Sequence, residues 1–185
     1  MILVDTLEKK NAHVIRYFDA HNIPWKPLRL AQGDYMLEGN DAITIDRKSG
    51  LQEVYGNLIG SQHVRFRNEC IRAQEAGQSL VVLIETQSKE SFSWNTENEP
   101  PIEFVSDVHK WVNPRTRWFF ATRKSPRFAT NKKQYPPLSS ASLQRMMETM
   151  TEKYGVVWRF TPKNRCGEEI ARLLGFNDFA EQIYN

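Results

Sequence analysis

The hydrophobic residues of this chain form short continuous runs and longer stretches in which they recur every three to four residues. Short apolar runs predict buried strands, whereas the wider spacing predicts helices with one apolar face. Strands are predicted over residues 2–4, 35–37, 42–46, 80–84 and 156–160. Helices are predicted over residues 8–21, 51–59, 63–76, 104–111, 139–150 and 167–174. Because strands and helices alternate, the chain is predicted to be an α/β protein.

The run at residues 80–84 is apolar at every position, which is typical of a parallel strand covered on both faces. Pro24 and Pro27 are expected to end the first helix, and residues 38–41 to form the turn of a hairpin. The hairpin would place residues 42–46 next to residues 35–37. Its second strand would continue toward Asp46 and Lys48.

The composition fits one folded domain over residues 1–185 with a sizeable core, because 40% of the residues are apolar. No run of about 18 apolar residues is present, so no membrane span is expected. The two cysteines, Cys70 and Cys166, lack a metal-site spacing and favour a reduced, cytoplasmic setting. Cys70 is expected to be a small core residue of a helix.

The candidate chemistry lies at Gly33-Asp34 and, twelve residues later, at Asp46-Arg47-Lys48. Residues two apart in a strand point to the same face, so Asp46 and Lys48 would face together and Arg47 away. Two carboxylates suit Mg²⁺ or Mn²⁺, and an ammonium beside the ion can orient a water molecule and stabilise transition-state charge. The set therefore predicts a metal-dependent phosphodiester nuclease. An isolated D-x-K is common by chance, and an exposed strand with alternating charges is the competing interpretation.

The charges are unevenly distributed, although the net charge is only +3. Residues 85–107 are acidic, whereas residues 108–142 contain no acid at all. We interpret 88–138 as an insertion that is polar first and basic afterwards. A stretch of cations with interleaved aromatics favours a polyanion such as DNA. Its basic residues are Lys110, Arg115, Arg117, Arg123, Lys124, Arg127, Lys132 and Lys133. The Trp118-Phe119-Phe120 run is expected to be mostly core.

The motifs of this chain, in their order along the sequence, resemble those of the XPF-type nuclease domain family, a branch of the restriction-endonuclease-like fold. The family signature G-D-x(n)-E-R-K-x3-D is similar to Gly33-Asp34 and Asp46-Arg47-Lys48. Three further segments resemble the family's opening strand, helix end and arginine-bearing helix with its following strand. They are 4–8 (VDTLE), 56–58 (GNL) and 65–85. Residues 146–160 are similar to small stand-alone members from phages and mobile elements.

The sequence departs from the family pattern at three positions. Asp46 replaces the motif glutamate, so the metal would lie closer to the strand. Leu7 stands where the family often has arginine. The last motif aspartate falls at Gln52, and we assign that role to Glu53 by allowing one extra loop residue.

The resemblance implies a PD-(D/E)xK core in which a mixed sheet is flanked by helices. It also implies a Mg²⁺- or Mn²⁺-dependent DNA endonuclease that acts on branched DNA such as flaps, forks or Holliday junctions, often as a homodimer. Such enzymes serve DNA repair and recombination. Two alternative functions stay open. One is an inactive DNA-binding or dimer-partner scaffold on the same fold, and the other is a restriction-like enzyme that cuts duplex DNA at a fixed sequence.

The roles of several residues also stay open. Asp5 either approaches the metal or caps the first helix in a D-x-x-E pattern with Glu8. Arg47 belongs to the catalytic set and is expected to pair with an acid such as Glu53 or Asp5, or to contact a phosphate. Arg65 and Arg67 are candidate DNA contacts on a helix, where at most one need face the DNA.

Overall fold

The structure, a computed structural model, describes residues 1–59, 62–86, 101–116, 119 and 137–176. Its strands are β1 (Ile2–Asp5), β2 (Trp25–Leu28), β3 (Tyr35–Leu37), β4 (Asn40–Lys48), β5 (Ser79–Thr86) and β6 (Val157–Pro162). Its α-helices are α1 (Ala12–Ala20), α2 (Leu51–Leu58), α3 (His63–Glu75), α5 (Ser140–Tyr154) and α6 (Cys166–Leu173). Two 3₁₀ helices, η1 (Val105–Lys110) and η3 (Lys163–Arg165), are also described.

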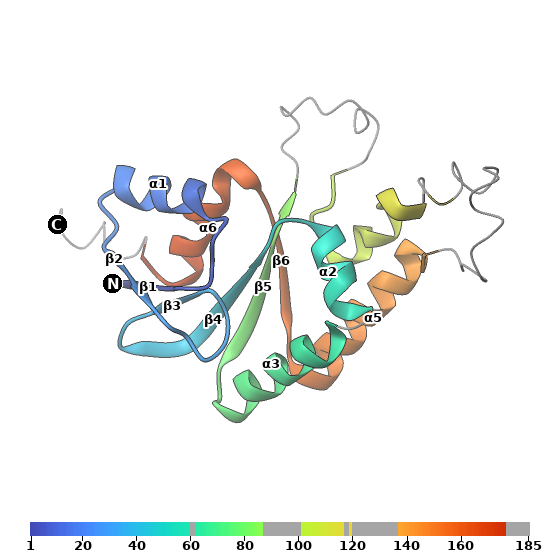
Figure 1. Cartoon of the computed structure of the whole chain (residues 1–185), viewed down its shortest axis with the longest axis horizontal. Coiled ribbons are helices and arrows are strands. Elements are labelled where there is room, and N and C mark those ends of the chain that lie inside the picture. Colours follow the sequence, from blue (N-terminus) through green and yellow to red (C-terminus); the bar gives the residue numbers. More distant parts are fainter. Residues whose placement is uncertain (60–61, 87–100, 117–118, 120–136, 177–185) are drawn as a thin grey trace.

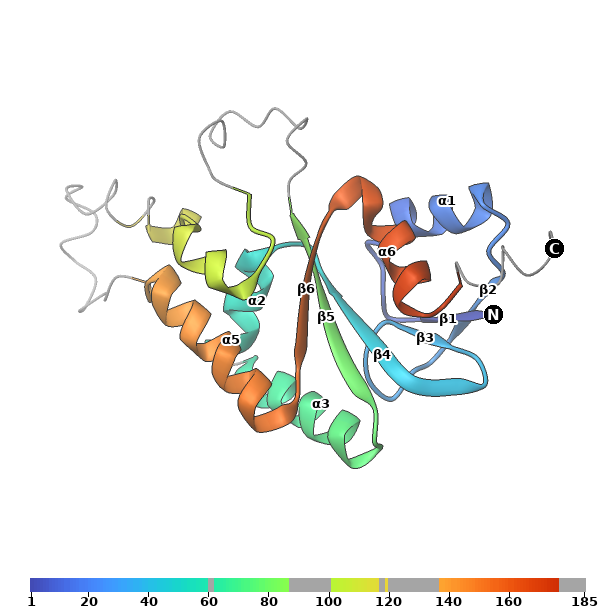
Figure 2. The ribbon, with the colours of Figure 1, turned by 180° about the vertical axis from the view of Figure 1, so that it is seen from behind.

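The six strands form one mixed sheet in the order β2-β1-β3-β4-β5-β6. Strand β3 runs antiparallel to both β1 and β4, whereas β4, β5 and β6 are parallel to one another. Helices α1 and α6 cover one face, and α2, α3 and α5 cover the other (Figures 1 and 2). The predicted α/β class, with a mixed sheet flanked by helices, is therefore confirmed.

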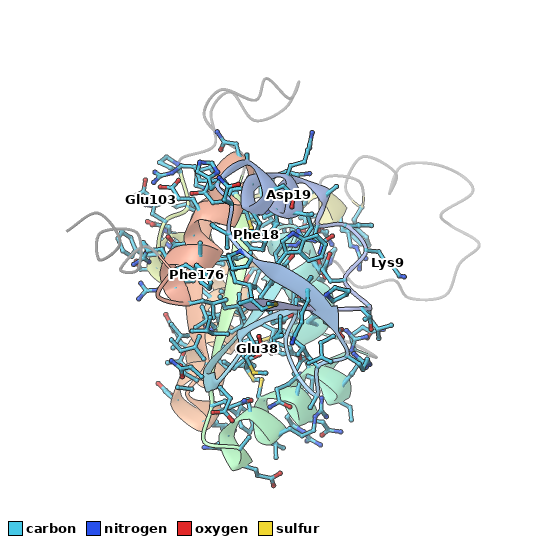
Figure 3. The ribbon with its side chains drawn as sticks, turned by 90° about the vertical axis from the view of Figure 1, so that its left-hand side faces the viewer. Lys9, Phe18, Asp19, Glu38, Glu103 and Phe176 are labelled. Atoms are coloured by element: carbon cyan, nitrogen blue, oxygen red, sulfur yellow. The ribbon has the colours of Figure 1, made fainter. Side chains whose placement is uncertain are left out.

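Strand β5 shows how the sequence divides the core between the two faces. Its residues Val81 and Leu83 pack in the cluster under α1 and α6, whereas Leu80, Val82 and Ile84 pack in the cluster under α2, α3 and α5. This strand is buried on both faces, as the continuous apolar run predicts. Figure 3 looks onto the α1 side, where Phe18 is fully buried and Asp19, next to it in the helix, is exposed.

Two local predictions were wrong. Helix α1 begins at Ala12 rather than at residue 8, so Asp5 and Glu8 do not cap it. Strand β2 contains Pro27 and was not expected, but it lies at the sheet edge, where a residue without an N–H is tolerated. The helix predicted over 104–111 is present as a 3₁₀ helix over Val105–Lys110.

The described part of the predicted insertion packs against the core of the domain. Val108 of η1 is fully buried in the α2-α3-α5 cluster, and Ile102, Val105 and Trp111 pack against it. Phe119 is also buried, in agreement with the prediction for that position, and Trp118 and Phe120 lie outside the described residues. Among the described residues, no helix is long and apolar enough to cross a membrane.

Candidate active site

Asp34 is placed by a turn that requires glycine before it. Gly33 has a φ of +68°, and a Cβ at this position would lie 2.2 Å from the Thr44 hydroxyl oxygen. The Gly33 N–H donates to Glu69 Oε1 at 2.9 Å, and the Asp34 N–H donates to the Ile45 carbonyl at 2.6 Å. These bonds fix the carboxylate beside the end of β4, where Oδ2 accepts the Arg47 N–H at 2.8 Å.

Asp46 and Lys48 lie on the face of β4 that α2 and α3 cover. Both are buried, and Lys48 Nζ lies 2.8 Å from Oδ1 and 2.7 Å from Oδ2 of Asp46. The ammonium also lies 5.8 Å from the centre of the Phe66 ring of α3. Alternation along the strand therefore brings Asp46 and Lys48 together, and the β3–β4 pairing adds Asp34.

Both carboxyl groups have raised pKa values in this site. Burial raises the pKa of Asp34 well above its usual value, and the charges of Asp46 and Glu8 add to this effect. Burial likewise raises the pKa of Asp46 to about 6, although Lys48 opposes the shift. Both oxygens of Asp46 lie next to the Lys48 ammonium, and Oδ1 accepts its hydrogen bond. Buried carboxylates that lie this near to one another fit a divalent cation, which would neutralise both charges.

Lys48 stays protonated in this setting. Burial alone would lower its pKa, but the charge and hydrogen bond of Asp46, together with Asp34 and Glu53, raise the pKa above its ordinary value. A permanently charged ammonium can orient a water molecule and stabilise negative charge, but it cannot accept a proton. Lys48 therefore suits the role of a cation rather than that of a general base.

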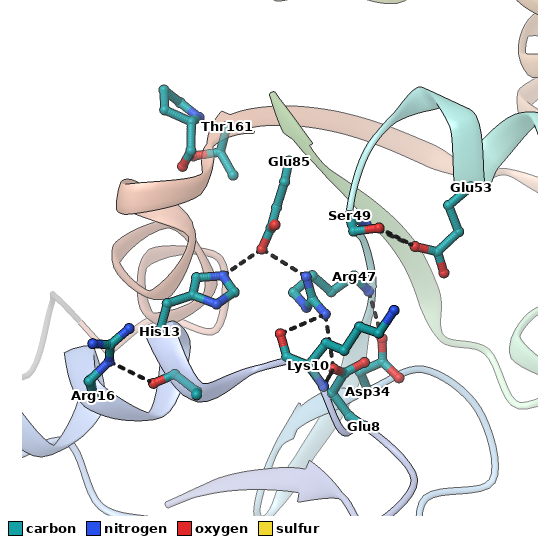
Figure 4. Close-up of polar contacts among 12 residues, drawn as sticks. Glu8, Lys10, His13, Arg16, Asp34, Arg47, Ser49, Glu53, Glu85 and Thr161 are labelled. Carbon is teal, nitrogen blue, oxygen red and sulfur yellow. Dashed lines mark hydrogen bonds and ion pairs between the residues drawn. The ribbon is translucent and has the colours of Figure 1, made fainter. Parts of the chain in front are cut away.

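Arg47 points to the opposite face of the sheet, where two acids hold it (Figure 4). Its guanidinium donates to Glu85 Oε1 at 2.8 Å and to Glu8 Oε1 at 2.9 Å. The prediction of an acidic partner was correct, but the partners are neither Glu53 nor Asp5. Only 5% of Arg47 is exposed, so its side chain does not reach a phosphate in this conformation. Its N–H positions Asp34, which makes Arg47 a positioning residue.

Asp5 has a structural partner. Arg29 donates to both of its carboxylate oxygens, at 2.8 and 2.9 Å, and the Leu30 N–H donates to Oδ1 at 3.1 Å. These bonds tie β1 to the segment after β2 and occupy the oxygens that a metal would need. The geometry therefore favours a structural role over the predicted metal-ligand role.

Two glutamates lie at the rim of the Asp46 site. Glu53 accepts from the N–H and the hydroxyl of Ser49, both at 2.9 Å, and so closes the first turn of α2. Glu69 of α3 holds Gly33, and its charge raises the pKa of Asp46. We did not predict a role for Glu69 from the sequence. The sequence feature that could have indicated this role is an acidic residue on the side of the arginine-bearing helix that faces the sheet.

The predicted DNA contacts are only partly described. Arg65 and Arg67 are both exposed on α3. Lys110 pairs with Asp107 at 2.7 Å, and the Arg115 guanidinium lies 6.0 Å from the centre of the Tyr55 ring of α2. The others lie outside the described residues: Arg117, Arg123, Lys124, Arg127, Lys132 and Lys133.

Comparison with known proteins gives structural relatives. No family model matches the sequence, and no curated protein matches it either. A solved structure of XPF from Aeropyrum pernix is similar with a TM-score of 0.56 and 16% identity, over 100% of this chain and 71% of that one. A complex of XPF from Aeropyrum pernix with DNA is similar with a TM-score of 0.52 and 19% identity, over 93% and 63% of the two chains. At this identity, the similarity shows a shared fold.

Proposed function

We propose that residues 1–185 act as a single metal-dependent nuclease domain that hydrolyses phosphodiester bonds in DNA. The observation that carries the proposal is the meeting of Asp34, Asp46 and the charged Lys48 at the buried end of β4. Structural similarity to an XPF nuclease supports the proposal independently of these residues. The site fits Mg²⁺ or Mn²⁺, because its ligands are hard carboxylate oxygens.

Asp34 and Asp46 would hold the ion, with the Arg47 carbonyl oxygen as a further ligand. The bound ion supplies positive charge at the scissile phosphate and lowers the pKa of the attacking water. Lys48 orients that water for in-line attack and stabilises the negative charge that develops on the phosphate oxygens. Glu53 lies near enough to influence Lys48 electrostatically, and we assign it a supporting role at the water side of the site.

We further propose that the substrate is branched DNA, such as a flap, fork or Holliday junction. The complex of Aeropyrum pernix XPF with DNA supports DNA as the partner. The basic residues between 108 and 142 would bind the phosphates, and a homodimer would place two sites on one junction. These features suit an enzyme of DNA repair or recombination, including one encoded by a phage or mobile element.

The experiment that tests this function is cleavage of labelled duplex, flap, fork and four-way-junction DNA with Mg²⁺, Mn²⁺ or EDTA. The proposal predicts cleavage that requires the metal and prefers a branched substrate. Cleavage of plain duplex at one sequence, without preference for branches, would support the restriction-like alternative. Tight binding to branched DNA without cleavage under any metal would support the scaffold.

Metal binding should weaken as the pH falls through about 6. The ion must displace protons from two carboxylates whose pKa values are raised, that of Asp46 to about 6. Below this pH, the apparent Mn²⁺ affinity is expected to fall about tenfold per pH unit for each displaced proton. Mn²⁺ titration at a series of pH values measures the effect. The rate of cleavage at limiting Mn²⁺ should fall over the same pH range, and saturating Mn²⁺ should shift this fall to lower pH.

A pH profile of cleavage that does not change with Mn²⁺ concentration would contradict the assignment of Asp34 and Asp46 as ligands.

Arg65 and Arg67 provide a matched pair for locating the DNA. Two positions apart on a helix, they point in nearly opposite directions, and both are exposed. We expect one of Arg65→Ala and Arg67→Ala to weaken DNA binding and to reduce the slope of log Kd against log salt by about one. The other variant should behave like the parent protein. Equal losses from both variants would show that α3 does not bind DNA along one side.

A further inference from the structure

A second buried group of polar side chains lies on the other face of the sheet, away from Asp46 and Lys48. His13 lies near the start of α1, Glu85 near the end of β5, and Cys166 at the first position of α6. One donor atom from each residue lies within 4.8 Å of the other two. His13 Nε2 lies 2.5 Å from Glu85 Oε1, as Figure 4 shows. Three elements distant in sequence therefore bring a nitrogen, an oxygen and a sulfur to one point.

We propose that His13, Glu85 and Cys166 bind a zinc ion. This site is separate from the proposed catalytic metal site and does not depend on the nuclease function. The ion would join the two helices of one layer, α1 and α6, to the end of the central strand β5. Three protein ligands leave a fourth position for water or another small ligand.

The donor set decides the choice of metal. A thiolate and an imidazole select Zn²⁺ over Mg²⁺ or Ca²⁺, which prefer oxygen ligands. Zinc bonds of about 2.0–2.3 Å place tetrahedral ligands roughly 3.3–3.7 Å apart. The His13–Glu85 pair must therefore open by about 1 Å, a shift that a helix-end side chain can make. Cys166 is fully buried, whereas the His13 side chain is 16% exposed, which gives the ion a route of entry.

The surrounding charges also favour a cation. Glu8 and Glu85 contribute two negative charges, and Arg47 between them contributes one positive charge. The two carboxylates outnumber the single guanidinium. Zn²⁺ would bind the Cys166 sulfur with loss of the thiol proton. Burial and the charge of Glu85 raise the pKa of the Cys166 thiol, so the metal rather than the protein must drive this deprotonation.

The site also has a structural link to the proposed active site. Glu85 holds the Arg47 guanidinium, and the Arg47 N–H holds Asp34. An ion on Glu85 would fix the end of β5 beside this arginine. Zinc would thus reinforce the frame that positions Asp34, without touching the substrate.

Cobalt provides a spectroscopic test, because Co²⁺ replaces Zn²⁺ and reports its ligands. We expect Co²⁺ added to the metal-free protein to give visible bands of a tetrahedral ion and a thiolate-to-cobalt charge-transfer band, which Zn²⁺ then abolishes. Cys166→Ala and His13→Ala should each lose these bands. Cys70→Ala is the matched control, since Cys70 is the other buried cysteine and lies in the opposite core cluster.

A second measurement keeps the test valid if Cys166→Ala folds poorly. Zinc at a hundred times its Kd is expected to raise the Tm of the parent protein by about 5–10 °C. The rise should be lost in His13→Ala and kept in Cys70→Ala. Asp46→Asn should keep both the bands and the rise, which separates this site from the catalytic one. Absence of a charge-transfer band in the parent protein, or its survival in Cys166→Ala, would overturn the proposal.

Discussion

Asp46→Asn is expected to slow metal-dependent cleavage at least about a hundredfold at saturating DNA. The substitution removes one charge from the two carboxylates that would hold the ion, and the ion accounts for several kcal/mol of transition-state stabilisation. A hundredfold loss corresponds to only about 2.7 kcal/mol, so the estimate is conservative. Single-turnover cleavage of the preferred branched substrate is the appropriate measurement.

The matched control for this change is Asp41→Asn. Asp41 lies on the same strand, β4, but it is exposed at the opposite end from the site. We expect the control to cleave at the parent rate and to bind DNA equally well. If Asp46→Asn also cleaved at the parent rate in Mg²⁺, Asp46 would not hold the metal in the reaction.

Arg47→Ala is expected to lower the free energy of unfolding by about 3–5 kcal/mol. The guanidinium is buried between Glu8 and Glu85, and its removal leaves the buried Glu85 and the partly buried Glu8 without this partner. Urea denaturation of the metal-free protein measures this loss. Arg47→Lys should recover only part of the stability, because one ammonium cannot reproduce the fork that reaches both acids.

Arg172→Ala provides the control for an exposed ion pair. Arg172 contacts Glu169 at 2.6 Å but is 54% exposed, so the expected change is below about 1 kcal/mol. Equal effects of Arg47→Ala and Arg172→Ala would contradict the view that the Glu8–Arg47–Glu85 network holds the end of β4. The backbone N–H that holds Asp34 is kept in Arg47→Ala, so we expect any loss of cleavage in this variant to follow from its loss of stability.

Local periodicity was sufficient to predict the parts of the site that lie on one strand. Asp46 and Lys48 face together because side chains alternate along β4, and the apolar residues before them bury this end of the strand. The glycine before Asp34 was identified as part of the Gly33-Asp34 motif. Only the structure shows why this position requires glycine, because a Cβ there would clash with the Thr44 side chain.

The remaining parts depend on contacts between distant segments, which no local pattern records. Arg47 pairs with Glu8 and Glu85, which are 39 and 38 residues away, rather than with the expected Glu53 or Asp5. Strand β2 forms despite Pro27 because β1 is available as its neighbour. The spacing of the two cysteines along the chain gave no indication of a metal site at Cys166. The other two proposed ligands, His13 and Glu85, come from α1 and β5, which are distant from Cys166 in sequence.

Both proposed metal sites concern the same end of the sheet but use different chemistry. The oxygen ligands of Asp34 and Asp46 suit a hard cation, whereas the nitrogen and sulfur of His13 and Cys166 suit zinc. Arg47 lies between the two sites and contacts a member of each, Asp34 through its N–H and Glu85 through its guanidinium. Because the two sites use different donor atoms, we expect that each ion can be removed without loss of the other.

The most direct test of the catalytic assignment is titration of Mn²⁺ into the metal-free protein, followed by the electron paramagnetic resonance signal of free Mn²⁺. The measurement requires no knowledge of the substrate. We predict saturable Mn²⁺ binding that Asp34→Asn combined with Asp46→Asn removes and that Cys166→Ala leaves intact. Unchanged Mn²⁺ affinity in the double variant would show that these carboxylates do not hold the ion, and the nuclease assignment of this site would be wrong.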